Sequence, residues 1–262
     1  MNRRHWLQAA SASLAGLWLA ACDKLNSDPK FTGMLQRAEG LTLRAQRAVT
    51  DRKALAREFS PADISKDFRA NGSTRPDTEE YEALLASNFA GYKLVVDGLV
   101  ERPMELSLTE LRALPARSQI TRHDCVEGWS SIGKWKGARL GPLLDRAGLK
   151  PSARYIVFHC ADVLEQTLDG TGQYYESVDL VDAYHPQTIL AYEMNGATLP
   201  VKHGAPVRLR VERQLGYKHA KYVMRIEAVD RLDGLDANGQ TRIGRGKGGF
   251  WPDRGYEWYA GI

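Results

Sequence analysis

Apolar and polar residues alternate or cluster over short stretches through most of the chain after residue 90. Stretches rich in β-branched and aromatic residues favour strands, and here they end at Gly, Pro, Asn or Asp positions. The pattern predicts strands over Tyr155–Cys160, Thr188–Met194, Pro206–Val211 and Tyr222–Val229. Two more short strands are predicted within Tyr92–Pro103, joined by a turn at Asp97-Gly98, and another hairpin turn is predicted at Asn195-Gly196.

Helical spacing is clearest between residues 31 and 59, a segment rich in Leu, Ala, Arg and Glu that contains no proline. Apolar side chains recur there at intervals of three and four, which predicts a helix with a break near Gly40. Shorter helices are predicted over Ser107–Leu114 and over Leu140–Ala147, the second ended by Gly148. Short helices inserted among many short strands indicate a mixed α+β fold.

The first 22 residues are predicted to be a targeting signal rather than part of the folded domain. Arg3-Arg4 precedes an apolar run, residues 9–21, which is short for a membrane span of about 20 residues and suits a cleaved signal. The start resembles the twin-arginine export signal, and the run ends in a sequence that resembles a bacterial lipoprotein box, with Cys22 as the lipidated residue. These resemblances predict the periplasm and anchoring at the inner membrane, and an uncleaved N-terminal anchor stays an alternative.

The same patterns divide the chain into three parts. Residues 1–22 form the export signal with its lipobox, residues 23–59 a tether and helical extension, and residues 60–262 the main domain. The tail, residues 231–262, has too many aromatic residues for a disordered segment. We therefore expect the tail to fold back onto the domain near the mouth of a pocket.

Composition adds limits to this picture. The 262 residues carry a formal net charge of +4 without a dense run of Lys and Arg, so a nucleic acid is not an expected partner. The three cysteines, Cys22, Cys125 and Cys160, argue against a disulfide framework. If Cys22 carries lipid, a Cys125–Cys160 disulfide in an oxidising compartment remains an alternative to two free thiols.

Cys125 lies in a segment whose residue types could bind a metal or take part in catalysis. Residues 122–130 read Arg-His-Asp-Cys-Val-Glu-Gly-Trp-Ser. A thiolate is the form of cysteine that attacks electrophiles or binds metals, and nearby positive charge favours it. A soft metal ligand and the nucleophile of a hydrolase, assisted by His123 or His159, are therefore both open. No acidic residue placed to orient a histidine is evident, which weakens the hydrolase hypothesis.

Two basic segments lie downstream, Pro200–Leu209 and Gly216–Tyr222. Their guanidinium and ammonium groups suit the binding of a phosphate. Charge runs of this kind more often form a solvated basic face, so the residues alone leave that alternative open.

In this order, the Cys125 segment, Gly133–Gly137 and the two basic segments resemble the molybdopterin-dependent oxidoreductases of the sulfite oxidase superfamily. The resemblance covers residues 60–262 and points to the branch that contains the catalytic subunits of bacterial protein-methionine-sulfoxide reductase. It implies the sulfite-oxidase molybdopterin-binding fold, with mixed β-sheets and inserted helices, after an N-terminal helical extension. It also implies a molybdenum-molybdopterin cofactor.

The resemblance assigns roles to particular residues. Cys125 is the implied metal ligand. The residues implied to hold the cofactor are Arg69, Ala70, Cys160, His203, Arg208, His219, Ala220 and Lys221. Of these, His203 and Arg208 would contact the pterin, and residues 219–221 would hold the phosphate. From its residue type alone, Cys160 is equally a small buried residue.

The surroundings of Cys125 receive implied roles as well. Tyr174 and Tyr175 fall where the family builds part of its substrate funnel, with packing at a surface as the alternative. The glycines after Cys125 would let the backbone approach a bulky cofactor. Trp129 and Trp135 would shield a metal from water, or else pack in the core.

The implied activity is two-electron oxygen-atom transfer, with reduction of an S-oxide or N-oxide, free or protein-bound, expected first. No Cys-x-x-Cys-His haem motif occurs, so electrons need a separate carrier, which in the nearest relatives is a membrane haem subunit. Val-Glu-Gly-Trp follows Cys125 where the sulfite oxidases proper have an Ala-Gly-Asn-type sequence, and their immunoglobulin-like dimerisation domain is not expected here. A monomer is therefore expected. Sulfite oxidation and a metal-free anchored lipoprotein that keeps the fold are the alternatives.

Overall fold

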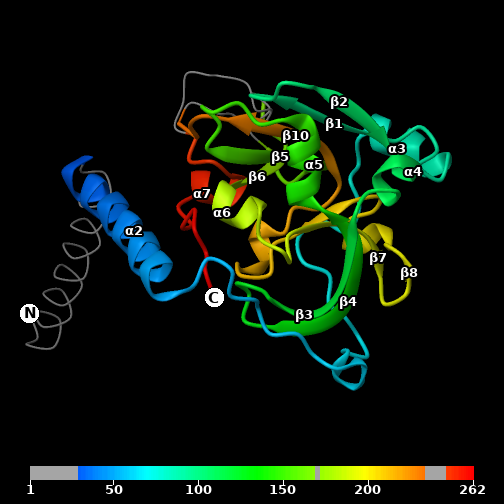
Figure 1. The fold of residues 1–262 in the computed structure, drawn as a ribbon, viewed down its shortest axis with the longest axis horizontal. Helices are drawn as coiled ribbons and strands as arrows, with labels where there is room; N and C mark the ends of the chain where they lie inside the picture. Colours follow the sequence, from blue (N-terminus) through cyan, green and yellow to red (C-terminus); the bar gives the residue numbers. More distant parts are fainter. Residues whose placement is uncertain (1–28, 169–171, 234–245) are drawn as a thin grey trace, which may run out of the picture. The chain divides into compact units, whose positions relative to one another are not determined.

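The structure is a computed structural model that describes residues 29–168, 172–233 and 246–262. It divides into two compact units after Thr50, and the described part of the first unit is a single helix. The second unit, Asp51–Ile262, contains both sheets (Figure 1). The predicted export signal and Cys22 lie outside the described residues.

Helix α2 spans Pro29–Val49 and continues through Gly40. The expected break is absent because one glycine costs only about 1 kcal/mol relative to alanine, and good helix formers surround it. The predicted boundary at residue 59 is also wrong, since Asp51 accepts a hydrogen bond from the backbone N–H of Lys53 at 2.6 Å and forms a turn. No helix of the described residues is long and apolar enough to cross a membrane.

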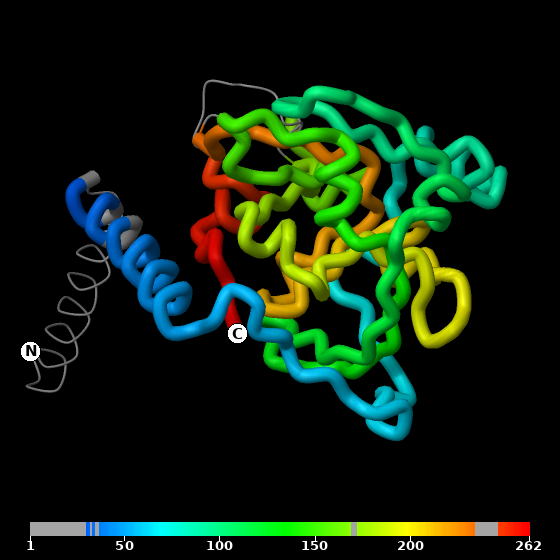
Figure 2. The backbone as a smooth tube through the Cα atoms, viewed as in Figure 1, coloured from blue at the N-terminus to red at the C-terminus, as the bar shows by residue number. Residues whose placement is uncertain are grey.

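Residues 54–59, predicted as helix, run instead along the edge of strand β3 (Ala116–Asp124). Glu58 forms an antiparallel bridge with Thr121. Figure 2 shows this segment passing beside the β3 hairpin. The unpaired backbone groups of an edge strand thus decide the conformation here, rather than the helical spacing of the side chains.

The first sheet has five strands in the order β2-β1-β10-β5-β6. Their bounds are Lys93–Gly98 (β1), Met104–Ser107 (β2), Tyr155–Val163 (β5), Gln173–Asp179 (β6) and Val223–Val229 (β10). β1 and β10 are parallel, and the other neighbouring strands are antiparallel. Because β10 joins early strands to the middle of the chain, this sheet depends on long-range pairing.

The second sheet has the order β3-β4-β7-β8, and β9 also pairs with β7. The bounds not yet given are Ser130–Arg139 (β4), Ile189–Met194 (β7), Ala197–Thr198 (β8) and Arg208–Arg210 (β9). β3 and β4 form a long hairpin that the sequence pattern did not predict. The buried side chains of β3 are Gln119, Thr121 and His123, which are polar, so the strand has no apolar alternation to detect.

Several predicted elements are confirmed. Helix α5 spans Leu140–Ala147 and ends at Gly148, whose φ of 71° is left-handed. β7 and β8 form the Asn195-Gly196 hairpin, and both turn residues have positive φ. The Asp97-Gly98 prediction holds in part, because the chain turns there but the second strand begins only at Met104.

The remaining α-helices are short: Glu79–Ala86 (α3), Leu108–Arg112 (α4), Leu180–Ala183 (α6) and Phe250–Asp253 (α7). α4 is the helix predicted to begin at Ser107, which caps it in a reciprocal capping box with Glu110. Together with the two sheets, these helices confirm the predicted α+β class.

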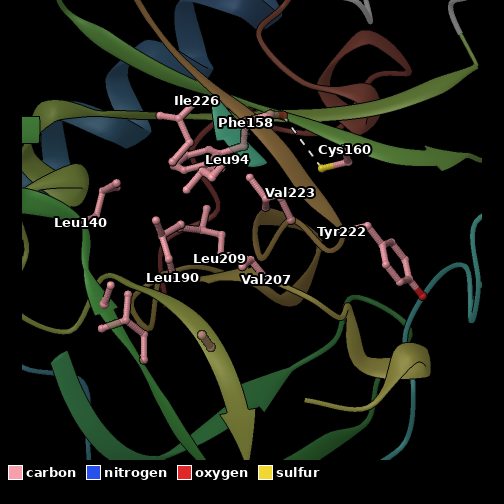
Figure 3. Packing of buried hydrophobic residues seen from close by; sticks show 14 of the residues in the cluster. Leu94, Leu140, Phe158, Cys160, Leu190, Val207, Leu209, Tyr222, Val223 and Ile226 are labelled. Carbon is pink, nitrogen blue, oxygen red and sulfur yellow. Dashed lines mark hydrogen bonds between the residues drawn. The ribbon is translucent and has the colours of Figure 1, made fainter. Parts of the chain in front are cut away.

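The core of the second unit lies between the two sheets. Figure 3 shows Leu94, Phe158 and Ile226 of the first sheet facing Leu190 and Leu209 of the second. All five side chains are fully buried. Burial of such a side chain stabilises the fold by about 1.5–3 kcal/mol, so packing between the sheets positions everything built on their ends.

The described tail, residues 246–262, folds back on the second unit as expected. Gly249 forms a bridge with Glu176 of β6. Glu176 also forms an ion pair with Lys218, and both side chains are completely buried. Burial, opposed by Lys218, raises the pKa of Glu176 to about 7. A Cβ on Gly249 would lie 2.5 Å from Oε1 of Glu176, so only glycine allows the tail to pack against this carboxylate.

We expect Lys218→Met to lower the free energy of unfolding by about 3–5 kcal/mol near pH 8, because it leaves a carboxylate buried without a counter-charge. Lowering the pH should reduce this loss, since the raised pKa lets Glu176 take up a proton in the folded state before it would in the unfolded chain. Urea denaturation followed by tryptophan fluorescence at several pH values measures both effects. The Lys218→Met/Glu176→Gln double variant is the matched control and should recover most of the loss; a double variant as unstable as the single one would contradict this account.

Candidate active site

A cavity lies where segments from both sheets and the tail meet. The loop before α3, the β3–β4 turn, β5, β6, the segment after β9 and α7 contribute, among others, Ser73, Cys125, Asp162, Tyr174, Lys221 and Trp251. His219 of the second basic segment also lines it. Two regions that are far apart in the sequence, the Cys125 turn and this basic segment, therefore share one cavity.

Cys125 follows the last residue of β3 and is half-buried. Its backbone N–H donates to the carbonyl oxygen of Trp129 at 2.9 Å, which closes the hairpin turn. Burial raises the pKa of the thiol, and neither the backbone N–H of Glu127 nor the charge of Arg69 offsets this rise. The expectation that nearby cations favour a free thiolate is therefore wrong. Such a thiol is a poor nucleophile but remains a usable metal ligand, because a metal displaces its proton.

In the structure, neither histidine proposed for the hydrolase hypothesis is placed to act as a general base for Cys125. Nδ1 of His123 lies 3.0 Å from a guanidinium nitrogen of Arg210, and Nε2 of His159 lies 3.0 Å from Glu227. Within the described part of the chain, no hydrogen bond joins either imidazole to Cys125. Cys125 and Cys160 are both free thiols, so the disulfide alternative does not hold either.

Lys221 is buried, but its three N–H donors are already engaged. Nζ donates to the carbonyl oxygens of Asn71 at 2.6 Å, of Lys202 at 3.3 Å and of Ser73. Burial, followed by the repulsion of Arg208, lowers its pKa. Lys221 therefore ties the loop at residues 71–73 to the basic segment.

Arg208 and Arg210 of β9 are fully buried and lie 5.0 and 4.5 Å from the ring centroid of Trp135. Arg210 is neutralised by Glu212, whose carboxylate oxygens it binds at 2.9 and 2.6 Å. Arg208 instead donates to two backbone carbonyl oxygens. Burial and the neighbouring Arg210 lower its pKa to about 9. Among the described residues, Arg208 thus has no acidic side chain bound to it.

His203 and His219 are buried close to these arginines. Nε2 of His219 lies 3.0 Å from the carbonyl oxygen of Gln214, so this nitrogen carries the proton. Burial, together with nearby cations, lowers the pKa of His203 to about 4 and the pKa of His219 well below its usual value. Both imidazoles are therefore neutral near pH 7.

The basic cluster contains buried polar atoms without a hydrogen-bond partner in the described residues. They are His123 Nε2, Trp135 Nε1, His203 Nδ1, Arg208 Nε and His219 Nδ1. Leaving such atoms unpaired costs about 1–3 kcal/mol each, so a ligand with donors, acceptors and negative charge would relieve them. Of these five residues, His219 lines the cavity, whereas His123, Trp135, His203 and Arg208 lie behind its wall. A pterin edge with a phosphate offers polar atoms that would relieve Nδ1 of His219, so this side of the cavity fits molybdopterin.

The alternative of a solvated basic face is wrong. Arg208, His219 and Lys221 are 0, 3 and 5% exposed, respectively. Ala220 is buried between the last two, and its carbonyl oxygen accepts a hydrogen bond from the N–H of Leu209 at 2.7 Å. The basic segment is therefore an interior part of the fold that is held against β9.

Cys160 does not line the cavity. It is 1% exposed in the middle of β5, with its Sγ 4.0 Å from the carbonyl oxygen of Phe158 (Figure 3). Burial raises the pKa of its thiol well above the usual value. This is the environment of a small core residue, the alternative that its residue type allowed.

Tyr174 and Tyr175 are neighbours on β6 and point to opposite faces, as side chains along a strand do. Tyr174 lines the cavity, and its hydroxyl donates to the carbonyl oxygen of Tyr217. The hydroxyl of Tyr175 instead donates to Asp253 at 2.7 Å, which fastens α7 to β6. The predicted substrate role is therefore open to Tyr174 and not to Tyr175.

Arg69 and Ala70 lie on the loop that leads into the cavity wall, and neither lines the cavity. The exposed guanidinium of Arg69 lies 5.4 Å from the ring centroid of Trp129 and 3.8 Å from Glu127. Nε1 of Trp129 donates to Glu127 at 2.9 Å. This loop is therefore joined to the Cys125 turn through a half-exposed cluster, and Trp129 is not a buried wall.

Two glycines of β4 face protein rather than open space. A Cβ on Gly133 would lie 3.1 Å from Phe68, and one on Gly137 would lie 2.2 Å from the carbonyl oxygen of Leu190. The expectation that these glycines make room for a cofactor is wrong. They allow Phe68 and strand β7 to approach β4 closely.

Asp162, which no sequence motif indicated, is a buried carboxyl in the cavity wall. Its Oδ2 accepts a hydrogen bond from the hydroxyl of Ser73 at 2.6 Å, and its Oδ1 has no partner in the described residues. Burial raises its pKa, while the Ser73 bond and the charge of Lys221 oppose the rise. The available signal was an aspartate in an apolar strand segment, because an ionisable side chain is seldom fully buried without a reason.

The fold and the cavity agree with a known family. A family model described as the oxidoreductase molybdopterin binding domain matches residues 82–234. The chain belongs to this family. It is therefore an oxidoreductase with a molybdopterin-binding domain, and the predicted sulfite-oxidase-type fold is confirmed.

Individual relatives in this family are similar over different lengths. The chain is 34% identical over 260 residues, 99% of its length and 87% of the relative, to YedZ1 of Azospira oryzae, named as a subunit of protein-methionine-sulfoxide reductase. It is 34% identical over 181 residues to the protein-methionine-sulfoxide reductase catalytic subunit MsrP of Ralstonia nicotianae. The matched residues make up 66% of this chain and 54% of that protein. The crystal structure of the sulfane dehydrogenase SoxCD from Paracoccus pantotrophus matches 58% of this chain and 44% of that chain, with a TM-score of 0.48 and 23% identity.

We expect the protein prepared without cofactor to lose stability as the pH falls from about 6.5 towards 4, because His203 has a lower pKa in the folded than in the unfolded state. Its contribution is complete above the unfolded pKa and changes by at most about 1.4 kcal/mol per pH unit below it. Urea titrations across this range measure the free energy of unfolding. His203→Gln should reduce the slope relative to wild type, and an unchanged slope would rule out this histidine as its source.

Proposed function

We propose that the chain is a periplasmic molybdenum oxidoreductase that reduces an S-oxide by two-electron oxygen-atom transfer. The observation that carries the proposal is the cavity shared by Cys125, His219 and Lys221. A metal ligand and a phosphate-binding region must lie within the length of one cofactor, and the fold brings these distant residues to such a cavity. The family supports oxidoreductase chemistry there.

The chain offers each part of the cofactor a matching group. Cys125 would hold the molybdenum, because a thiolate is a soft ligand. No group of three His, Cys, Asp or Glu side chains in the described residues forms a metal site, so the remaining ligands would come from the dithiolene. His203, Arg208 and His219 would bind the pterin and phosphate, and Lys221 would add charge. When bound, the cofactor supplies the two-electron redox chemistry.

The cavity wall supports an S-oxide on an apolar side chain as the substrate. Leu164, Tyr174 and Trp251 give it apolar surface. The relatives are named for reduction of methionine sulfoxide in proteins, and a thioether side chain is apolar except at its oxidised sulfur. Sulfite is a compact anion that gains nothing from apolar walls, which makes its oxidation a less suitable activity for this cavity. N-oxides share the polar oxygen and belong in the same assay.

We propose that electrons arrive from a separate membrane haem subunit. The sequence has no Cys-x-x-Cys-His motif for a covalently attached haem. The relatives are named as subunits of a reductase, which is compatible with a division of labour between catalysis and electron supply. Apart from that partner, we propose that the chain is a monomer.

We propose that the mature protein is anchored at the periplasmic face of the inner membrane. Arg3-Arg4 supports export by the twin-arginine route, and Cys22 supports attachment of lipid. The twin-arginine route carries folded proteins, so the cofactor would be inserted before export. A lipid on Cys22 would hold the enzyme near a membrane-bound electron donor.

We expect wild-type protein from molybdenum-replete cells to contain about one molybdenum and one pterin per chain, and Cys125→Ser to lose the molybdenum and at least about 99% of the S-oxide reduction. The reason is that a serine hydroxyl is a poor replacement for a soft thiolate ligand. Elemental analysis, pterin fluorescence after oxidation, and reduction of methionine sulfoxide by a chemically reduced dye measure the three quantities.

Cells grown with tungstate provide the matched control, because the protein sequence is unchanged while the metal differs. Tungsten-loaded protein should keep the pterin and lose most of the activity. Wild-type protein without stoichiometric molybdenum and pterin would reject the enzyme and favour the metal-free lipoprotein. Loaded protein that oxidises sulfite but reduces no S-oxide or N-oxide would favour the sulfite-oxidase-like alternative.

For localisation, we expect the Arg3→Lys/Arg4→Lys double variant to accumulate in the cytoplasm, because the export signal requires the arginine pair. Cys22→Ser should still be exported but should leave the membrane fraction, since it has no thiol to carry lipid. Cell fractionation and mass spectrometry of the N-terminal peptide measure these outcomes. Export of the double variant at the wild-type rate would contradict the twin-arginine route.

A further inference from the structure

Reduction of an S-oxide consumes protons as well as electrons. One S-oxide, two protons and two electrons give one sulfide and one water: the S–O bond breaks, sulfur keeps an electron pair, and the oxygen leaves as water. The electrons come from the external donor through the bound cofactor. The protons must reach the oxygen from a group that lines the cavity.

Several titratable side chains of the cavity wall already donate their protons in hydrogen bonds to backbone carbonyl oxygens. The hydroxyls of Tyr174 and Tyr217 donate to the backbone carbonyl oxygens of Tyr217 and Glu257. All three N–H groups of Lys221 donate to carbonyl oxygens. Releasing a proton from any of these groups would break a buried hydrogen bond.

Two other side chains of the wall are unsuited for different reasons. His219 is neutral and gives its Nε2 proton to the carbonyl oxygen of Gln214, so it presents a lone pair at Nδ1. Glu127 is exposed and accepts a hydrogen bond from the indole of Trp129. Cys125 is assigned to the metal, so its proton is lost when the metal binds.

Asp162 differs from all of them. It is 3% exposed, and Oδ1 has no hydrogen-bond partner in the described residues. Asp162 lies near the end of β5, where the pairing with β6 is irregular between His159 and Val163, and its side chain lines the cavity. Burial raises the pKa of the carboxyl, which favours its protonated form.

The surroundings of Asp162 suit repeated proton transfer. The titratable groups that interact with it are Tyr81 from α3, Cys160 from β5, Tyr174 from β6, and Lys221 and Tyr222 from the segment before β10. Lys221 is the cation among them, and it stabilises the carboxylate left after the proton has gone. The hydroxyl of Ser73 bonds to Oδ2 at 2.6 Å, and its loop is partly exposed to solvent. A hydroxyl both donates and accepts, so it can relay a proton from water.

We propose that Asp162 is the catalytic acid that protonates the departing oxygen of the substrate, and that Ser73 relays protons to it from solvent. Asp162 delivers one proton, is reprotonated through Ser73, and delivers the second, so that the oxygen leaves as water. The inference rests on the proposed S-oxide reduction, and it adds a residue and a proton route to that reaction.

The test compares holoenzymes of wild type, Asp162→Asn and Ser73→Ala, with Asp77→Asn as the matched control on the exposed part of the same loop. Molybdenum and pterin content are measured first, then the turnover of methionine sulfoxide with a chemically reduced dye across pH. General acid catalysis contributes on the order of 10²–10⁴-fold, so Asp162→Asn should lower kcat by at least about 10²-fold at full cofactor loading. Asp77→Asn should behave as wild type.

The pH profile separates a proton donor from a structural role. In wild type, kcat should fall as the pH rises and Asp162 loses its proton. Because the Ser73 hydroxyl stabilises the carboxylate, Ser73→Ala should move this fall to higher pH, and Asp162→Asn should abolish it. Infrared difference spectra of the resting enzymes should contain a pH-dependent carboxylic acid band in wild type that Asp162→Asn lacks.

A fully loaded Asp162→Asn enzyme with wild-type kcat and pH profile overturns the inference while S-oxide reduction stands. If Asp162→Asn fails to load, Ser73→Ala decides: an upward shift of the pH limb supports the inference, and an unshifted limb overturns it. Loaded wild-type enzyme that reduces no S-oxide removes the proposed function, and the inference fails with it.

Discussion

Buried positive charge is the constraint on which the cavity depends. Arg208 and Lys221 lie inside the protein, and the described residues bind them through carbonyl oxygens rather than carboxylates. Glu212 forms its ion pair with Arg210. Keeping such groups charged in a dry interior is unfavourable, so it draws on the stability that the packed sheets provide. A bound polyanion would therefore return part of that free energy to the folded state.

The architecture supplies the two sides of the cavity by different means. The β3–β4 hairpin carries Cys125 at its turn, fixed by backbone hydrogen bonds of the hairpin. The basic segment has little regular structure and is held by hydrogen bonds to β9 and by the contacts of Lys221 with the loop at residues 71–73. Lys221 therefore has a structural role, because its ammonium group holds the loop that contains Ser73.

The tail completes the site from a third direction. Tyr175 holds α7 through Asp253, and the buried Lys218–Glu176 pair lies where Gly249 packs on β6. These contacts bring Trp251 to the cavity wall. The wall thus combines an apolar surface from the tail with a carboxyl from β5 and cations from the basic segment.

The sequence by itself determined the α+β class, the helix over Leu140–Ala147, the Asn195-Gly196 hairpin, and the order of the Cys125 and basic segments, because periodicity, turn residues and motifs are local properties. Only the tertiary structure decided what depends on partners distant in the chain. It placed residues 54–59 along the edge of β3. The sequence pattern did not predict β3, because the buried side chains of this strand are polar. It directed Tyr175 away from the cavity and Asp162 into it, since a strand's two faces look alike in sequence until the opposing layers are known.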